Sequence, residues 1–372
     1  MNSPTDDAKR EFVHPDFRFK PGNRILALQL KRIGDLVLTT AALRTLRANF
    51  PKAHIGLGVA EGNVSLLPAI AGIDSVLVFG GGRGFAPWQQ VLAGGWITVL
   101  DFTGTDRSAL ATALSRAQRR VTFAWAQKSW WRSLAYNEFV DSAVRERHTA
   151  EHYLDLVRTI RPTSKMPNSL PREAAVSGAG PRPLPALKLP ETIRTQMLTL
   201  LREAGVAGSF ALIHPGTARE DKYWKVERWA EVIDHLQGQR GLRCVLSGGN
   251  DPYEQAHVAA IQAAAKTAPI NFAGKTDVLG LAALAEQARV VVSCDTGVVH
   301  LASAFGTPQV VLYGPINPFH WRPQHTRAVV LSATQPDAPL TKFDPRMKGA
   351  PMERISTALV IRATEDILAA SA

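Results

Sequence analysis

The chain has 372 residues, of which 45% are hydrophobic and 20% are charged, and its formal net charge is +11. This length exceeds what one ordinary core accommodates, so we expect two domains of roughly 150–190 residues. The composition is unlike that of a disordered protein, and no apolar run approaches the ~20 residues that a membrane-spanning helix needs. The first 22 residues are polar and charged, so we expect no secretory signal peptide.

The first half of the sequence alternates short apolar runs with segments of helical spacing. Strands are predicted at Arg24–Leu30, His54–Val59, Ser75–Phe79, Trp96–Asp101 and Arg120–Ala124. Helices are predicted between them at Leu36–Asn49, Asn63–Leu67 and Ser108–Ala117, and after them at His148–Ile160. Such alternation indicates βαβ units and therefore a parallel, doubly wound sheet.

A proline-rich stretch separates this half from the next. Residues 161–190 contain seven prolines, which cannot sustain a helix or a central strand, so this stretch contains the connection between domains. The predicted organisation is an N-terminal extension, an N-terminal domain, a linker, a C-terminal domain and a C-terminal helix, at residues 1–22, 23–175, 176–190, 191–350 and 351–372.

The second half repeats the alternation and so predicts a second parallel sheet. Its predicted strands are Phe210–His214, Leu242–Ser247, Ile270–Phe272, Val290–Ser293 and Gln309–Tyr313. Its predicted helices are Val226–Leu236, Tyr253–Ala265, Asp277–Ala288, Val298–Phe305 and Met352–Ala370. The last of these follows the final strand, so it could pack back across the domain boundary.

Charge is unevenly divided between the halves. Residues 1–186 carry a net +9 and residues 187–372 a net +2, which points to an anionic partner on the first domain or to a generally basic surface. A nucleic-acid-binding protein is disfavoured, since no helix-turn-helix, RNP-type or zinc motif accompanies the charge. Cys244 and Cys294 each lie in an apolar run, and we expect both to be buried free thiols in a reducing cytoplasm.

The loop after the first predicted strand contains an acid beside two cations. Asp35 follows Lys31, Arg32 and Gly34, and the cations favour its ionised form. An ionised carboxylate in a domain cleft can accept a proton from an attacking hydroxyl, although Asp35 could instead be an ordinary helix cap. The loop lacks G-x-G-x-x-G, which argues against a dinucleotide oxidoreductase.

Three further segments suit a nucleotide. Thr217 and Lys222 lie in a loop that could bind phosphate or simply be a solvated charged loop. Glu254 could hold ribose hydroxyls, although an Asp-capped helix with a capping box explains it equally well. The strongest signal is a helix start formed by Asp295, Thr296, Gly297 and His300. It could bind a pyrophosphate through its first backbone amides. The alternative is an ordinary capped helix with a histidine in the core.

The stretch Trp125–Arg132 interleaves aromatic side chains with cations. It could stack on sugars, lie at a bilayer interface, or bury two tryptophan faces in the core. Gly274-Lys275-Thr276 resembles the end of a P-loop, but Pro269 stands where that motif requires glycine.

Taken together, these motifs resemble glycosyltransferase family 9, the lipopolysaccharide heptosyltransferases. The matching segments are Ile25–Thr40, Ala211–Trp224, Phe272–Leu284 and Val290–Gly314, with Phe319–Pro323 most like the third heptosyltransferase of core assembly. The resemblance implies a GT-B architecture, in which two Rossmann-like domains enclose a cleft. It also implies metal-independent, inverting transfer without a cofactor, from ADP-L-glycero-D-manno-heptose to the inner core of a lipid A–linked oligosaccharide.

The resemblance also assigns roles to single residues. Asp35 corresponds to the catalytic base, and Lys31, Arg32, Lys128 and Arg132 are candidates for binding the anionic acceptor. The nucleotide-sugar site corresponds to Thr217, Lys222, Glu254, Asp295, Thr296, Gly297 and His300. We expect an enzyme of the cytoplasm that transiently visits the inner face of the bacterial inner membrane. The alternatives are a related transferase that uses another nucleotide sugar and the disfavoured nucleic-acid-binding protein.

Overall fold

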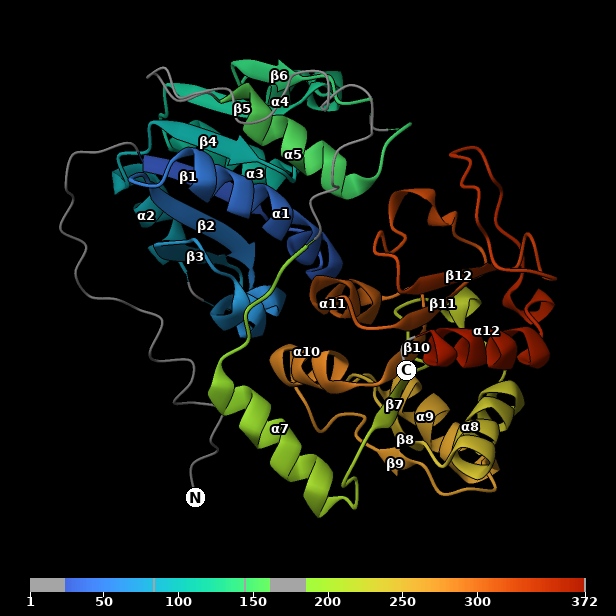
Figure 1. Ribbon diagram of the computed structural model, residues 1–372. Helices are drawn as coiled ribbons and strands as arrows, with labels where there is room; N and C mark the ends of the chain where they lie inside the picture. The colour runs from blue at the N-terminus through green and yellow to red at the C-terminus, as the bar shows by residue number, and fades with distance from the viewer. Residues whose placement is uncertain (1–23, 83, 144, 161–184, 371–372) are drawn as a thin grey trace.

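The computed structural model describes residues 24–82, 84–143, 145–160 and 185–370, which form two α/β halves side by side (Figure 1). The predicted extension at residues 1–22 and most of the predicted linker at residues 176–190 lie outside the described residues. No helix among the described residues is both long enough and apolar enough to cross a membrane.

The N-terminal half is a six-stranded parallel sheet in the order β3-β2-β1-β4-β5-β6. Its strands are β1 (Arg24–Gln29), β2 (His54–Ala60), β3 (Ser75–Phe79), β4 (Thr98–Asp101), β5 (Arg119–Phe123) and β6 (Glu138–Val140). Its helices are α1 (Ile33–Asn49), η1 (Glu61–Ala69), α2 (Ala86–Ala93), α3 (Asp106–Leu114), η2 (Ala124–Lys128), α4 (Trp130–Ser133) and α5 (Thr149–Thr159).

Side-chain alternation along β1 separates the two helical layers of this half. Ile25 and Ala27 pack with α1 and α5, whereas Leu26 and Leu28 pack with Val91 of α2 and with α3. The helices therefore cover opposite faces of the sheet, as a doubly wound fold requires.

The C-terminal half has the same strand order, read in the opposite direction: β12-β11-β10-β7-β8-β9. Its strands are β7 (Phe210–His214), β8 (Arg243–Leu246), β9 (Ile270–Asn271), β10 (Val290–Cys294), β11 (Gln309–Tyr313) and β12 (Ala328–Ser332). Its helices are α7 (Glu191–Glu203), η3 (Glu220–Lys222), α8 (Val226–Arg240), α9 (Pro252–Ala264), α10 (Val278–Gln287), α11 (Gly297–Phe305), η4 (Pro318–His320), η5 (Met352–Arg354) and α12 (Thr357–Ala369).

One continuous apolar cluster joins the two halves. Leu36 and Val37 of α1 belong to the same buried cluster as Val298 and Leu301 of α11. Two histidine rings reinforce the interface, since His148 Nε2 lies 2.9 Å from the carbonyl oxygen of Arg322 and His320 Nδ1 lies 2.9 Å from that of Arg147. The buried contact therefore holds the start of α1 against the start of α11.

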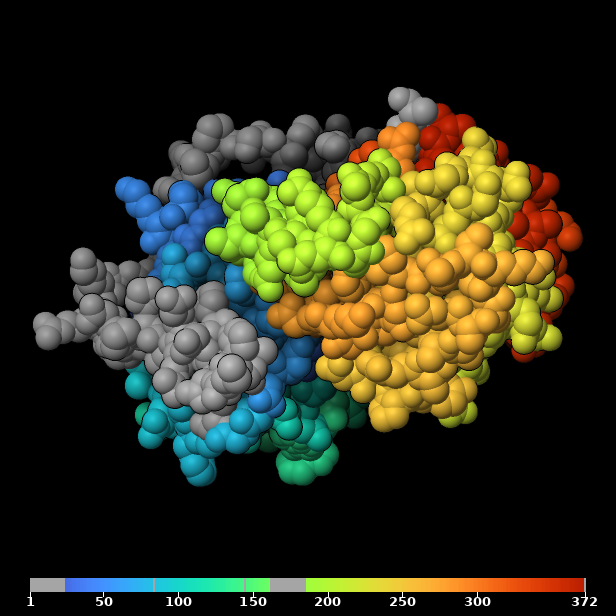
Figure 2. Space-filling view, turned by 90° about the horizontal axis from the view of Figure 1, so that it is seen from below, coloured from blue at the N-terminus to red at the C-terminus, as the bar shows by residue number. Residues whose placement is uncertain are grey.

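Helix α7 completes the connection between the halves. In Figure 2 it lies beside α10, next to the blue residues of the N-terminal half. Arg194 of α7 donates to both carboxylate oxygens of Glu286 in α10, at 2.6 and 2.7 Å. Met197 and Leu201 on the same helix are buried in the shared apolar cluster.

The structure confirms both parallel sheets and corrects several predicted elements. The segment predicted as a helix at Asn63–Leu67 is the 3-10 helix η1, which contains Pro68. The predicted C-terminal helix is divided into η5 and α12, because Ser356 accepts a hydrogen bond from the amide of Leu359 and starts a new helix. Rather than crossing to the other domain, α12 packs on α8 and on strands β10–β12.

Candidate active site

Candidate residues gather where the strand order reverses in each sheet. In the first sheet this point lies between β1 and β4, and in the second it lies between β7 and β10. Loops beyond the carboxyl ends of strands diverge there and leave room for a ligand. Asp35 follows β1, Thr217 and Lys222 follow β7, and Asp295 follows β10.

Asp35 is not a helix cap. Helix α1 begins at Ile33, and its N-cap residue, Arg32, makes no side-chain capping bond. The Asp35 side chain instead accepts a hydrogen bond at Oδ1 from the Tyr153 hydroxyl, at 2.6 Å. The cap interpretation is therefore wrong, and the carboxylate is directed to a residue of α5.

Tyr153 donates a hydrogen bond to Asp35, a role that the sequence does not predict. From the sequence, Tyr153 is expected only on the apolar side of a helix. Its side chain is buried. Burial, and then the negative charge of Asp35, hold the pKa of Tyr153 well above its usual range. The phenol therefore stays protonated and donates a hydrogen bond to the Asp35 carboxylate. The backbone of Asp35 is held as well, because its carbonyl accepts from Thr39 Oγ1 at 2.7 Å, and Thr39 accepts from Gln29 at 2.8 Å.

The two cations predicted beside Asp35 lie in the same turn. Arg32 is exposed and Lys31 is half-buried, so both side chains can meet a ligand from solvent. The carbonyl oxygen of Lys31 accepts from Asn63 Nδ2 at 2.8 Å, which holds this turn against η1.

Lys222 and Asp295 form an ion pair across the second reversal point. Lys222 Nζ lies 2.6 Å from Asp295 Oδ2 and 3.3 Å from the Asp295 carbonyl oxygen. Both side chains are largely buried. The pair is therefore close to neutral overall, and the carboxylate orients the ammonium group rather than presenting an uncompensated negative charge to an anion.

Helix α11 begins directly after this pair. Thr296 is its N-cap residue and makes no side-chain capping bond, so its hydroxyl remains available. The first amides of the helix are unpaired within it and, together with the helix dipole, favour an anion. A side chain at Gly297 would bring its Cβ within 2.6 Å of Ile33 Cγ2, so this glycine allows the two helix starts to approach.

His300 lies between the two halves of the site. A Cβ atom at Gly34 would lie 2.6 Å from the His300 Cδ2 atom, which places the imidazole directly against the turn that precedes Asp35. Burial lowers the pKa of His300, and the charges of Asp295 and Asp35 oppose that shift only in part. The ring is therefore neutral near pH 7, where it can donate one hydrogen bond without adding charge.

Glu254 lies beside the Thr217 loop. Its carboxylate packs over Gly216, where a Cβ atom would lie 1.8 Å from Oε1, and next to Gly249, where a Cβ atom would lie 3.0 Å from Oε2. Burial raises the pKa of Glu254, while a hydrogen bond from the Gly249 amide opposes the shift. Asp251 caps α9 by accepting from the amides of Tyr253 and Glu254, so the predicted Asp cap is confirmed. The Glu254 carboxylate itself faces the Gly249 amide and lies 3.8 Å from His214 Nε2.

The predicted acceptor residues Lys128 and Arg132 lie apart from Asp35 in the fold. They belong to η2 and α4, which follow β5, and β4 separates β5 from β1. Lys128 is exposed, and Arg132 Nε pairs with Asp106 Oδ1 at 2.5 Å. Trp130 is exposed too, so the interpretation of this stretch as a helix with its tryptophans in the core is wrong for that residue.

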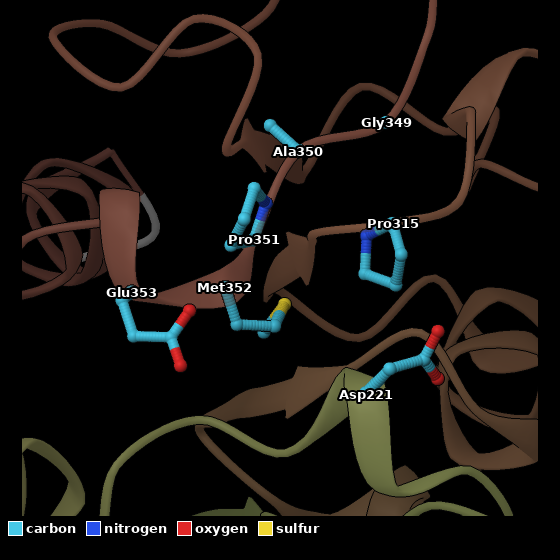
Figure 3. Close-up of a pocket in the computed structure, with 7 residues that line it drawn as sticks. All are labelled: Asp221, Pro315, Gly349, Ala350, Pro351, Met352 and Glu353. Carbon is cyan, nitrogen blue, oxygen red and sulfur yellow. The ribbon is translucent and has the colours of Figure 1, made fainter.

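A hollow of about 400 Å³ lies next to the Lys222 loop (Figure 3). It is bounded by Pro315 after β11, by the chain from Gly349 to Glu353, and by Asp221. The carboxylates of Asp221 and Glu353 both border it (Figure 3). The described residues that line the hollow include no lysine or arginine, and Asp221 is already paired with Arg219. Phosphates are therefore better accommodated at the start of α11.

Each sheet has the strand order of a Rossmann fold, and the two halves meet through α1 and α11, which follow the carboxyl ends of β1 and β10. Two such domains facing each other define the GT-B class of glycosyltransferases. The sequence model of the protein family glycosyltransferase family 9 (heptosyltransferase) matches residues 85–350 of the chain. Since this match covers more than half of the chain, the protein belongs to that family and is a glycosyltransferase.

Named relatives agree with this assignment. The chain is 25% identical to lipopolysaccharide heptosyltransferase 3 of Escherichia coli K12 over 304 residues, 78% of this chain and 82% of the relative. It is 26% identical to lipopolysaccharide heptosyltransferase 1 of the same strain over 309 residues, 79% and 89% of the two chains.

Solved structures share the fold. The family 9 glycosyltransferase of Veillonella parvula superposes with a TM-score of 0.76 at 22% identity, over 94% of this chain and 97% of that one. ADP-heptose lipopolysaccharide heptosyltransferase II of E. coli gives a TM-score of 0.73 at 20% identity, over 93% and 99%.

Proposed function

We propose that the protein transfers a heptose, with inversion, from ADP-L-glycero-D-manno-heptose to the inner core of lipopolysaccharide. The observation that carries this proposal is the apposition of Asp35 and the start of α11 across the His300 ring. A group able to take a proton thus lies in one domain, opposite an anion-binding helix start in the other. An acceptor hydroxyl and a donor phosphate need that arrangement.

In the proposed reaction Asp35 removes the proton of an acceptor hydroxyl. Since Tyr153 occupies Oδ1, Oδ2 takes the proton. The acceptor oxygen forms a bond to the anomeric carbon while the bond from that carbon to the phosphate oxygen breaks. The electron pair leaves with ADP, and attack from the face opposite the departing phosphate inverts the configuration.

Lys222 and the first amides of α11 stabilise the departing ADP electrostatically. The Asp295 carboxylate holds Lys222 in place for this role, and the Thr296 hydroxyl supplies a further donor. Glu254 accepts hydrogen bonds from the ribose hydroxyls, and Thr217 binds phosphate from the adjacent loop. The ADP complex of the E. coli heptosyltransferase WaaC, which shares the fold at a TM-score of 0.68 and 23% identity, supports an ADP-linked donor.

The acceptor is proposed to be a lipid A–linked oligosaccharide that carries carboxylates and phosphates. The net +9 charge of residues 1–186 suits such an anionic partner. Lys31 and Arg32 lie closest to Asp35 along the chain, with Lys128 and Arg132 as more distant contacts. The proposed location is the cytoplasm and, transiently, the inner face of the inner membrane, and the proposed branch is that of the third core heptosyltransferase.

The second candidate function is transfer from a different nucleotide sugar. It is favoured by the generic nature of the helix start and of Lys222, which recognise phosphates rather than a base or a sugar.

A transfer assay with ADP-heptose and purified lipid A–inner-core acceptor tests the proposal. We expect ADP release that requires the acceptor, and a product whose anomeric configuration is opposite to that of the donor. Release without a glycosylated product, or a product that retains the donor configuration, would contradict it.

A further inference from the structure

The outer layer of the N-terminal half exposes an unusual number of large apolar side chains. Of the eight large hydrophobic residues exposed in the described part of the chain, six belong to or border α2, α3 and α4: Phe85, Leu92, Leu110, Trp130, Trp131 and Leu134. Phe85, Trp130 and Leu134 are 80%, 78% and 73% exposed. Such a concentration on one layer marks an interaction surface.

This outer layer faces away from the C-terminal half, which is the proposed donor half. Helices α2 and α3 pack on the sheet face opposite α1 and α5, and α3 contacts α4. The contact with the C-terminal half is made from the other layer, through α1 and α11. The donor half therefore leaves the α2–α3–α4 surface uncovered.

Several residues of this surface lie at the same edge of the sheet as Asp35. Phe85 follows β3 and precedes α2, Arg107 lies in the first turn of α3 after β4, and Trp130 starts α4 after β5. All strands of this sheet are parallel, so the segments that follow them emerge at one edge. The exposed aromatic side chains thus border the edge where the proposed base is found.

The charge of the surface is positive. Segments 85–93, 105–116 and 124–134 contain four cationic residues and one carboxylate, and the carboxylate, Asp106, is already paired with Arg132. Arg107, Arg116 and Lys128 are exposed. An anionic partner is therefore complementary to this surface.

We propose that the α2–α3–α4 surface docks on an anionic phospholipid bilayer. Tryptophan and phenylalanine favour the interfacial region of a bilayer, leucine favours its apolar part, and flanking arginine and lysine attract anionic headgroups. The proposal deepens the proposed function, on which it rests for its purpose: docking in this orientation brings the Asp35 edge next to a lipid-anchored acceptor. The donor half stays in water, where the nucleotide sugar is found.

Vesicle flotation tests the surface directly. The full chain is mixed with vesicles of phosphatidylcholine alone or of phosphatidylcholine with phosphatidylglycerol, at low and high salt. We expect binding to the anionic vesicles that weakens with salt. The variant Phe85→Ser/Trp130→Ser/Leu134→Ser, whose changes are all at exposed positions, should bind at least about tenfold more weakly. Leu198→Ser, which removes an exposed leucine of α7, is the matched control and should bind like the wild type.

Three outcomes would overturn the docking proposal: no binding of the wild type to anionic vesicles, unchanged binding of the triple variant, or equal loss in the control. A change in oligomeric state of the triple variant without a change in vesicle binding would assign the surface to a protein partner and overturn it too. Stabilisation by ADP and turnover of a delipidated, soluble acceptor are measured in parallel. Their failure in the wild type, with vesicle binding intact, would reject the proposed function and leave the docking surface standing.

Discussion

Asp35 and Asp295 occupy comparable places in the two halves, yet they have different partners. Each follows a central strand of a six-stranded parallel sheet and lies at the start of a helix. Asp35 accepts a hydrogen bond from a neutral phenol, whereas Asp295 pairs with an ammonium group at 2.6 Å. The partner of the first carboxylate is therefore a neutral hydrogen-bond donor, whereas the partner of the second is a cation.

The difference shows how one fold can supply two chemistries. A carboxylate that binds a proton in the reaction must remain basic, and a single neutral donor orients it without cancelling its charge. A carboxylate close to phosphates would repel them unless a cation compensates it. The two proposed roles therefore follow from the two partners. Asp35 contacts Tyr153 of α5, and Asp295 contacts Lys222 of η3.

Substitution of Asp35 gives the largest expected effect. Asp35→Asn keeps the size of the side chain and its ability to accept from Tyr153, but it removes the basic oxygen. Turnover should fall by about 10²–10⁴, while ADP affinity measured by calorimetry should change little. Near-normal turnover would remove Asp35 from the mechanism.

Substitution of Lys222 should act on binding rather than on proton transfer. Lys222→Ala removes an attraction to phosphate and leaves Asp295 unpaired next to it, so ADP binding should weaken by about 1.5–3 kcal/mol. Lys225→Ala, an exposed lysine three residues along, is the control and should bind ADP normally. Unchanged affinity in Lys222→Ala would place the nucleotide elsewhere.

The sequence predicts the positions of Asp35 and Asp295 but not the side chains that they contact. Repeated strand-loop-helix units locate Asp35, Lys222 and Asp295, because parallel strands align their carboxyl ends and short loops carry the polar residues. The sequence cannot show which distant element touches each carboxylate. Tyr153 reads as an apolar helix position, since its buried hydroxyl has a partner 118 residues away.

The sequence predicts the edge strands β3 and β9 but not the edge strands β6 and β12 or helix α2, for a local reason. Strand β6 is three residues long and only half-buried, so its apolar pattern is weak. Strand β12 has exposed charge and polar residues on both sides, and α2 follows a glycine-rich loop that obscures its start. Periodicity identifies buried central strands best, because burial on both faces gives them continuous apolar runs.

A third prediction concerns the pH dependence of folding stability that arises from the buried side chain of His214. Burial lowers the pKa of His214 to about 4, whereas an unfolded histidine titrates near 6.5. The unfolded state thus binds the proton first, so the stabilisation is present above pH ~6.5 and is lost as the pH falls toward 4. Urea unfolding should show a loss of about 2 kcal/mol at pH 5 relative to pH 7.5 from this group. An equally large pH dependence in His214→Gln would contradict the assignment.

The smallest expected effect concerns Tyr153, which we treat as a positioning residue. Tyr153→Phe removes the donor to Asp35 Oδ1 that fixes the orientation of the carboxylate, and a carboxylate that loses a hydrogen-bond donor binds a proton at higher pH. Turnover should fall by about 3–10-fold, and the acidic limb of its pH profile should move to higher pH, with the KM for the donor unchanged. Tyr136→Phe removes a similar buried bond, to Asp101, and should leave that limb in place. A lower turnover with an unmoved acidic limb would reduce Tyr153 to a packing role.

A thermal-shift panel of ADP, UDP, GDP and their sugar conjugates tests the division between the two halves most directly. A ligand at 100 times its dissociation constant adds about 2.7 kcal/mol of stability. We predict stabilisation by ADP and ADP-heptose in both the wild type and Asp35→Asn, with much smaller shifts for UDP and GDP compounds. A preference for UDP- or GDP-sugars would contradict the proposed donor, and no shift with any nucleotide would contradict the nucleotide site in the C-terminal half.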